Sequence, residues 1–353
     1  MFGLRSAILS ISICHLALPA QAATYDLPPR TRLESELLHA GEVVAPGISR
    51  IVAAGRDTVV VLENRPARLV RVLPDGRNEI LIGIGSAPWE IDAPECRMSR
   101  PRSRAERLGC GAIVLHALRE PRSVEWAPGG RVVPIRSDRI ITSFVARPDG
   151  VLATLFTSSS PEHGVLLGGT EQLGWFSSTS SGEELTKWTH EQGYFPFDYS
   201  DNAALDVARS YFARLLPRDE RTCYWVHGFA EGGVKVVSDK GTLLERFDVP
   251  RGELDALLDE SLPEVARHHV LADVAVDGAG RLHALRGLYA NDAGKLEKAN
   301  EVLVYDLEGR IVERYRLGVQ LIAFDLELDE GSYVGVDART MDVLRFPIPE
   351  SDR

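Results

Sequence analysis

The chain alternates between short apolar runs and tight polar turns. The runs are rich in Val, Leu and Ile and occupy residues 58–62, 140–146, 151–156, 234–237, 282–285, 302–305 and 333–336. Turn signals such as Pro148-Asp149-Gly150 stand between them. An Asp side chain accepts hydrogen bonds from the nearby backbone, and Gly adopts a positive φ without strain. Short strands separated in this way predict an all-β meander of antiparallel hairpins.

The turns recur at intervals that fit a repeated unit. From Gly55 to Gly331 the chain advances 276 residues, and five steps give a mean period of about 55, near that of propeller blades. Six units can be placed, at residues 48–90, 91–137, 138–190, 200–250, 270–318 and 320–349. The sequence therefore predicts a six-bladed β-propeller of four-stranded antiparallel blades. The last unit has only three apparent strands, so we expect residues 25–44 to pair with it and close the ring.

One segment has the period of a helix. Pro250 precedes residues 251–269, and apolar side chains recur there at helical spacing, at Leu254, Leu257, Leu258, Leu262 and Val265. We expect a short helical insertion in an otherwise all-β domain that spans residues 23–353.

The first residues have the layout of a cleavable secretory signal. Arg5 precedes the apolar run at 7–18, and the small-residue triplet Ala20-Gln21-Ala22 follows it. A short core helix or an anchor is the alternative, but twelve positions are too few to span about 30 Å of hydrocarbon, and no other run is long enough. We expect residues 1–22 to be a signal peptide and the mature protein to be periplasmic or secreted, without a membrane span.

Several segments resemble the repeats of NHL proteins. Residues 63–72 place Arg68 five positions after the acidic residue that ends a strand, and residues 337–346 have the same layout with Asp342 in the place of that Arg. Residues 273–285 resemble the first hairpin of an NHL blade. Residues 83–90 resemble a Gly-x-Gly-x-x-Pro-x-Glu connection of bacterial secreted six-bladed propellers related to that family. The resemblance implies a propeller and leaves function open, because such propellers include protein binders, RNA binders and enzymes.

Charge and cysteine content narrow the picture further. The chain has 51 acidic and 40 basic residues and a formal charge of −11, which argues against a nucleic-acid partner. In an oxidising compartment Cys96 and Cys110 can close a loop, with a stabilisation of about 3 kcal/mol. Cys223 lies in an apolar run, which indicates a buried thiol and not a catalytic one. The absence of a Cys-x-x-Cys pair argues against a zinc site.

The sequence contains no common catalytic motif. It lacks a Gly-x-Ser-x-Gly elbow, a Walker loop, a His-Glu-x-x-His pair and an EF-hand loop. Five arginines lie within the 96–110 loop, namely Arg97, Arg100, Arg102, Arg104 and Arg107. They either bind carboxylate or phosphate groups or pair with the acidic surface of the protein itself. The aromatic segment at 194–199 either forms a recognition surface or packs its rings onto the propeller.

One end of the predicted propeller collects most of the candidate functional residues. Connections between the second and third strands of a blade, and links between blades, meet at that end. The two largest insertions fall there, and loops longer than a hairpin requires are usually functional. The ligand-binding candidates are Glu63, Arg65, Glu90, His163, Tyr194, Asp198, Tyr199, Asp292, Asp337 and Arg339. We expect Arg65 and Arg339 to recognise anions and Tyr194 and Tyr199 to stack, unless the insertions simply cap the channel.

Two classes of function remain. The first is a monomeric binding module, without a cofactor, that takes a protein or small-molecule ligand on one propeller face. The second, by analogy with six-bladed lactonases, is a metal-assisted hydrolase with Ca²⁺ at the channel mouth. Ca²⁺ needs six to eight oxygen ligands, and with only five Asn the chain cannot easily supply an amide-rich site. We favour the binding module, because the sequence shows no chemistry of its own for catalysis.

Overall fold

The computed structural model describes about three-fifths of the 353 residues. The described ranges are 27–41, 48–55, 57–64, 67–82, 96–98, 113–117, 122–126, 132–136, 140–147, 150–158, 169–177, 184–194, 214–226, 233–239, 241–250, 270–327 and 331–349. Within these ranges every regular element is a β-strand. The helix predicted at 251–269 lies outside the described residues.

Four antiparallel sheets of four strands follow one another along the first part of the chain. The first contains β3 (Ile48–Gly55), β4 (Thr58–Asn64), β5 (Ala67–Val72) and β6 (Asn78–Ile82). The second contains β7 (Cys96–Met98), β8 (Ile113–Ala117), β9 (Arg122–Trp126) and β10 (Val132–Arg136). The third contains β11 (Ile140–Arg147), β12 (Gly150–Ser158), β13 (Gly169–Ser177) and β14 (Glu184–Tyr194). The fourth contains β15 (Arg214–Pro217), β16 (Thr222–Val226), β17 (Val234–Ser238) and β18 (Leu243–Phe247).

Two further sheets complete the C-terminal part. The fifth contains β19 (Leu271–Val276), β20 (Leu282–Arg286), β23 (Glu301–Tyr305) and β24 (Ile311–Leu317). A small hairpin of β21 (Leu288–Ala290) and β22 (Leu296–Lys298) lies between β20 and β23 in the chain. The sixth contains β25 (Leu321–Glu327), β26 (Ser332–Asp337) and β27 (Val343–Pro347).

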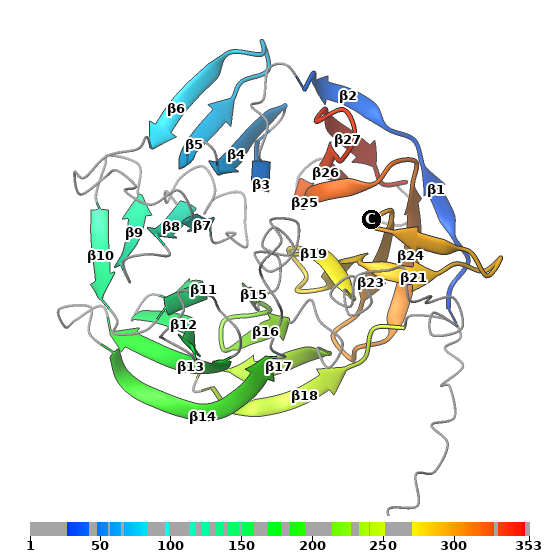
Figure 1. Ribbon diagram of the computed structural model, residues 1–353. Coiled ribbons are helices and arrows are strands. Elements are labelled where there is room, and N and C mark those ends of the chain that lie inside the picture. Colours follow the sequence, from blue (N-terminus) through cyan, green and yellow to red (C-terminus); the bar gives the residue numbers. More distant parts are fainter. Residues whose placement is uncertain are drawn as a thin grey trace, which may run out of the picture.

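The N-terminal strands join these last two sheets. β2 (Glu36–His39) pairs antiparallel with β27, as the fourth strand of the sixth sheet. The sequence predicted a pairing of residues 25–44 with this sheet. β1 (Thr31–Leu33) pairs parallel with β24 on the fifth sheet, which the sequence did not predict. The N-terminal arm, residues 27–41, therefore spans two neighbouring sheets (Figure 1).

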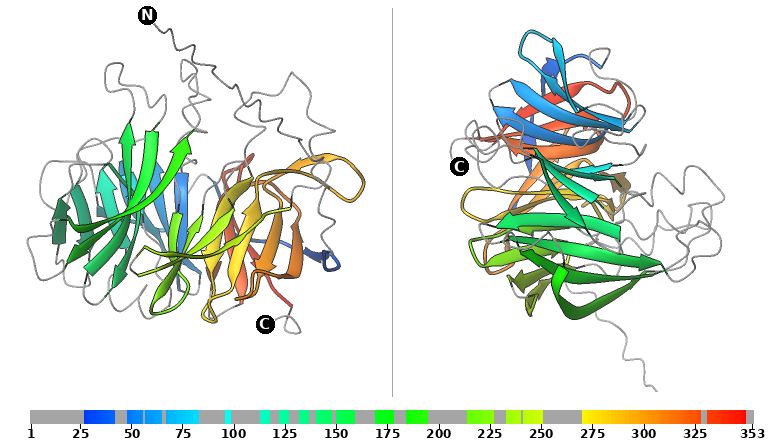
Figure 2. Two further views of the ribbon diagram at one scale, coloured as in Figure 1. Left: turned by 90° about the horizontal axis from the view of Figure 1, so that it is seen from below. Right: turned by 90° about the vertical axis from the view of Figure 1, so that its left-hand side faces the viewer.

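The sheets are arranged around a common centre, each with its first strand innermost (Figure 1), and Figure 2 shows the strands from the side. β25 contacts β3 on one side and β19 on the other, and β11 contacts β15 and β7. Apolar faces of adjacent sheets pack together. Phe324 and Tyr333 of the sixth sheet, for example, share a cluster with Tyr315 of the fifth. Burial of each such large side chain stabilises the fold by about 1.5–3 kcal/mol. This is the arrangement of a β-propeller.

Side chains of the innermost strands also join neighbouring sheets. Asp273 Oδ2 on β19 accepts a hydrogen bond from Phe324 N on β25 at 3.0 Å, and Asp325 Oδ2 accepts one from Ala53 N on β3 at 3.0 Å. An innermost strand has no strand partner on its channel side, so its buried N–H groups need acceptors of this kind.

The Asp-Gly turns have the geometry that the sequence predicted. In the turn between β23 and β24, Asp306 Oδ1 accepts hydrogen bonds from Glu308 N at 3.0 Å and Arg310 N at 2.8 Å. Gly309 in the same turn has a φ of 76°. Turns of this kind set the register of the strands that they join.

Candidate functional site: a charged cluster at the β21–β22 hairpin

The β21–β22 hairpin extends the connection between the second and third strands of the fifth sheet. Its turn is closed by Asn291, whose Oδ1 accepts hydrogen bonds from Ala293 N and Lys295 N, both at 2.9 Å. Gly294 provides the positive φ, 67°, that the turn requires. The hairpin extends away from the sheets (Figures 1 and 2) and places Asp292 at its turn.

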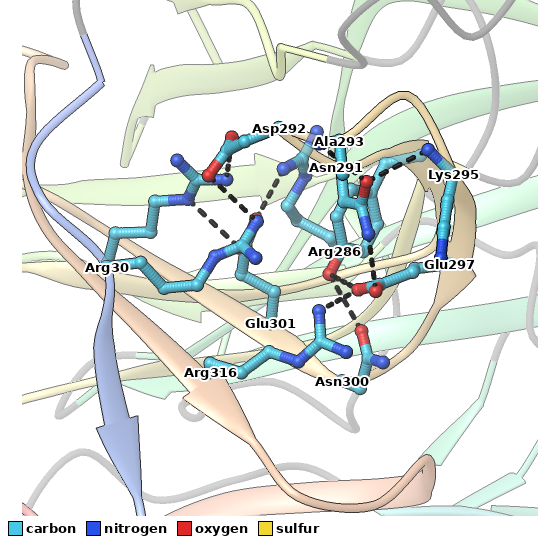
Figure 3. Close-up of polar contacts among 12 residues, drawn as sticks. Arg30, Arg286, Asn291, Asp292, Ala293, Lys295, Glu297, Asn300, Glu301 and Arg316 are labelled. Atoms are coloured by element: carbon cyan, nitrogen blue, oxygen red, sulfur yellow. Dashed lines mark hydrogen bonds and ion pairs between the residues drawn. The ribbon is translucent and has the colours of Figure 1, made fainter.

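Glu301, the first residue of β23, is the centre of a buried charged cluster. Its side chain is 0% exposed and contacts three guanidinium groups. Arg30 Nε lies 2.8 Å from Glu301 Oε1, Arg314 Nε donates to the same oxygen at 2.9 Å, and Arg286 Nη1 donates to Oε2. These residues come from β20, β23, β24 and the segment before β1, so the cluster is complete only when the N-terminal arm docks (Figure 3).

Asp292 closes the cluster on the solvent side. Arg314 Nη2 donates to Asp292 Oδ1 at 2.7 Å, and Arg30 Nη2 lies 3.4 Å from Asp292 Oδ2. The Asp292 side chain is 62% exposed, and the Arg30 side chain is 23% exposed. The hydrogen bond from Arg314 holds the pKa of Asp292 below its usual range, and the positive charges of Arg314 and Arg30 act in the same direction.

A second set of contacts braces the hairpin against the sheet. Asn291 Nδ2 donates to Glu297 Oε1 at 2.7 Å, and Arg316 on β24 forms an ion pair with Glu297. The Tyr289 hydroxyl oxygen lies 2.8 Å from Glu297 Oε2, and the Arg286 guanidinium stacks 3.8 Å from the centre of the Tyr289 ring. Burial raises the pKa of Tyr289 to about 12, so this hydroxyl stays protonated at neutral pH.

The cluster carries an excess of positive charge. Arg30, Arg286 and Arg314 contribute three positive charges, whereas Glu301 and Asp292 contribute two negative ones. The pair formed by Arg316 and Glu297 is neutral. Because Asp292 is the exposed member, the site opens to solvent at a carboxylate that two guanidinium groups hold.

Of the predicted ligand-binding residues, Asp292, Asp337 and Arg339 have described side chains. Asp292 belongs to the charged cluster. Asp337 is buried and its Oδ1 accepts a hydrogen bond from Arg339 N at 2.7 Å, so it caps its own turn. The Arg339 side chain is exposed. The structure therefore brings Asp292 together with Arg30 and Arg314 and gives it no contact with Asp337 or Arg339 within the described residues.

The other predicted residues cannot be placed in the site. Glu63 is the next-to-last residue of β4 and Tyr194 is the last residue of β14, but their side chains lie outside the description. The remaining predicted ligands are wholly outside the described residues, namely Arg65, Glu90, His163, Asp198 and Tyr199.

The predicted disulfide also falls largely outside the description. Cys96 lies on β7 with an undescribed side chain, and Cys110 lies outside the described residues, so their pairing stays a prediction. Cys223 is fully buried on β16, beside Trp225 and Leu215, as the sequence predicted.

Four residues of the cluster were not predicted from the sequence, namely Arg30, Arg286, Glu301 and Arg314. None of them belongs to a motif, and Arg30 and Glu301 lie far apart in the chain. One signal was available, because Arg286 ends the apolar run of β20 and Glu301 begins that of β23. Two opposite charges that border adjacent buried strands are candidates for an ion pair.

A second buried polar group has a structural role. His283 Nδ1 lies 2.8 Å from the Tyr333 hydroxyl oxygen, and His283 Nε2 lies 3.3 Å from Asp277 Oδ2. Burial raises the pKa of Asp277, but hydrogen bonds from His283 and Arg281 outweigh it, and the pKa falls below its usual range. His283 and Tyr333 are buried between the fifth and sixth sheets, so the group joins blades and does not face solvent.

The described residues lack two kinds of feature. These residues contain no group of three or more His, Cys, Asp or Glu side chains placed to hold a metal ion. They also contain no helix that is long and apolar enough to cross a membrane.

No family model and no curated protein matches the chain. Solved structures do match over most of its length. A streptogramin B lyase has a TM-score of 0.48 and 11% identity, over 90% of this chain and 98% of that one. A gluconolactonase from Xanthomonas campestris has a TM-score of 0.47 and 12% identity, over 90% of each chain. The β-propeller domain of Cps50 from Myceliophthora thermophila has a TM-score of 0.43 and 9% identity, over 90% of this chain and 100% of that one.

At these identities the comparisons concern the fold alone and transfer no activity to this chain. The sheets described above define its class. The chain is a β-propeller protein, and its described site is a charged cluster on a hairpin insertion.

Proposed function

We propose that the protein is an exported six-bladed propeller that binds a ligand or partner protein at one end. That end, the loop face, is where the second-to-third strand connections lie, here residues 287–300 and 338–342. In this proposal the six sheets of four or five strands are the blades of a single domain spanning residues 23–353. The pairing of β2 with β27 supports ring closure. The signal-like pattern of residues 1–22 supports export.

One observation carries the assignment of the loop face. On the β21–β22 hairpin, Asp292 is exposed to solvent and is held by ion pairs with Arg30 and Arg314. The opposite end of the same sheet has the tight turn at 306–310. A charged side chain held by buried groups is preorganised for recognition, and longer loops usually carry function. Metal-assisted hydrolysis is not proposed, because no feature of the described residues favours it.

The test compares the two ends of the fifth sheet. Leu296 on the hairpin and Leu307 in the opposite turn are similarly exposed, at 38% and 41%. A photo-crosslinking amino acid is placed at either position, and the mature protein is irradiated in extract from the source organism. We expect specific crosslinks from position 296 and none from position 307.

Point variants then measure the identified contact. We expect Leu296→Lys combined with Arg339→Glu to weaken the isolated partner's binding at least tenfold. The matched pair Leu307→Lys with Arg310→Glu should leave it unchanged, because Arg310 is also exposed but lies at the opposite end. Crosslinks confined to position 307, or equal losses from both pairs, would contradict the proposal.

A further inference from the structure

We propose that Arg30, Arg286 and Arg314 form a site for the carboxylate group of an acidic ligand, which displaces Asp292. The inference rests on the proposed function, because it names the chemistry of the ligand that the loop face binds.

The charge of the cluster favours an anionic ligand. Arg286 and Arg314 are almost completely buried and share Glu301 with Arg30, so three positive charges surround one fully buried negative charge. Buried like charges repel one another in a medium of low dielectric, unless counter-charges compensate them. Asp292 supplies the second negative charge from the surface, and within the described part of the chain the cluster keeps an excess of one positive charge. When Asp292 leaves, the excess rises to two, so an incoming anion is attracted.

The three arginines offer more hydrogen-bond donors than the acceptors of the cluster can use. Each guanidinium has five N–H groups, so the three arginines offer fifteen, and a carboxylate accepts about four. The Pro250 carbonyl oxygen accepts one of them, from Arg286 Nη2 at 2.7 Å. Arg286 Nε is buried and has no hydrogen-bond partner among the described residues, whereas Arg30 Nε and Arg30 Nη2 form ion pairs with Glu301 and Asp292. Buried donors of this kind need an acceptor, and a ligand carboxylate would supply two oxygens.

The Asp292 carboxylate already occupies the position that the ligand carboxylate would take. A carboxylate already reaches the two outer arginines from the solvent side, which shows that a group of this shape fits. The two contacts of Asp292 differ in length, since its Oδ1 lies 2.7 Å from Arg314 Nη2 but its Oδ2 lies 3.4 Å from Arg30 Nη2 (Figure 3). Asp292 is also mostly exposed and belongs to a hairpin turn, so it can leave without opening the core. It acts as an internal competitor for the ligand.

The experiment measures succinate binding to the mature protein by calorimetry. We expect Asp292→Ala to bind succinate at least tenfold more tightly than the parent protein, because the internal competitor is gone. The matched control is Asp75→Ala, which removes an exposed carboxylate paired with Arg77 in a hairpin turn of the first sheet. The control should bind succinate as weakly as the parent protein.

A second variant identifies the ligands. Adding Arg30→Gln to Asp292→Ala should remove at least tenfold of the gained affinity. Arg30→Lys in the same background keeps the charge but loses the planar guanidinium, which can donate two parallel hydrogen bonds to a carboxylate, and should weaken binding as well. Thermal unfolding of each variant establishes that it is folded. Equal succinate binding by the parent, Asp292→Ala and Asp75→Ala would overturn the inference, as would tighter binding of inorganic phosphate than of succinate by Asp292→Ala.

The two proposals fail separately. If Asp292→Ala binds no succinate while position 296 still crosslinks a partner, the carboxylate site is wrong and the loop face stands. If succinate binds as expected while crosslinks come only from position 307, the site exists and the proposed function of the loop face is wrong.

Discussion

At the scale of single residues, Glu301 is the group on which the cluster depends most. It is fully buried, and three arginines from separate parts of the chain share it. Removal of one partner of a buried ion pair is costly because it leaves uncompensated charge in the interior, whereas an exposed pair contributes little. The same chemical change should therefore have very different effects at buried and exposed positions.

We expect Glu301→Gln to lower the free energy of unfolding by about 3–5 kcal/mol. The amide keeps the size of the side chain but removes the charge that balances the three arginines. Glu79→Gln is the matched control, since Glu79 pairs with Arg71 at 3.0 Å on the exposed edge of the first sheet and should cost less than about 1 kcal/mol. Urea unfolding measures both. A loss at Glu301 no larger than that at Glu79 would show that the cluster does not depend on this carboxylate.

Asp292 was predicted from the sequence, and the opposite charges of Arg286 and Glu301 at the ends of buried strands were a further signal, but Arg30 and Arg314 gave none. An apolar run predicts a strand from residues that are adjacent in the sequence, so this signal is local. The contact between Arg30 and Glu301 depends on the docking of β1 beside β24, a pairing between distant segments. Asp292 could be predicted because the turn that carries it is visible in the sequence.

At the scale of elements, each of the seven apolar runs in the sequence lies within a described strand. The run at 302–305 lies within β23, the run at 333–336 within β26 and the run at 140–146 within β11. The parallel pairing of β1 was not predicted, because three residues carry too little pattern to choose a partner. The Asp-Gly pattern was the other sequence signal, because it predicts tight turns. At Gly309 this pattern also affects the stability of the fold.

Gly309 and Gly76 distinguish two reasons why a turn needs glycine, a positive φ and a lack of space for a side chain. Both have a φ of 76°, a conformation that costs an L-residue about 1–2 kcal/mol. A Cβ on Gly76 would meet open space, whereas a Cβ on Gly309 would lie 2.4 Å from the Phe247 ring of the neighbouring sheet. We expect Gly76→Ala to cost about 1 kcal/mol and Gly309→Ala about 2–4 kcal/mol, because overpacking adds to the backbone strain. Urea unfolding of the two variants would contradict this if their losses were equal.

At the scale of the whole molecule, the N-terminal arm links two blades and the charged cluster. β1 extends the fifth sheet, β2 completes the sixth, and Arg30 lies immediately before β1. Without the arm, the outer edges of β24 and β27 would be exposed, and Glu301 would lose one of its three arginines. Exposed edges promote association between chains, so the arm matters for solubility as well as for stability.

Two leucines of the N-terminal arm, one buried and one exposed, test whether packing of the arm against the sheets stabilises the fold. Leu33 on β1 is buried in the cluster between the fifth and sixth sheets, whereas Leu37 on β2 is exposed. We expect Leu33→Ala to lower the free energy of unfolding by about 2–4 kcal/mol and Leu37→Ala by less than about 0.5 kcal/mol. Deletion of the arm, residues 27–41, should go further, giving aggregation at concentrations where Leu33→Ala stays dispersed. Urea unfolding and light scattering measure these effects. If the truncated protein unfolded at the same urea concentration as the parent and stayed monomeric, the arm would not be part of the propeller's closure, and the docking of Arg30 on Glu301 would need another explanation.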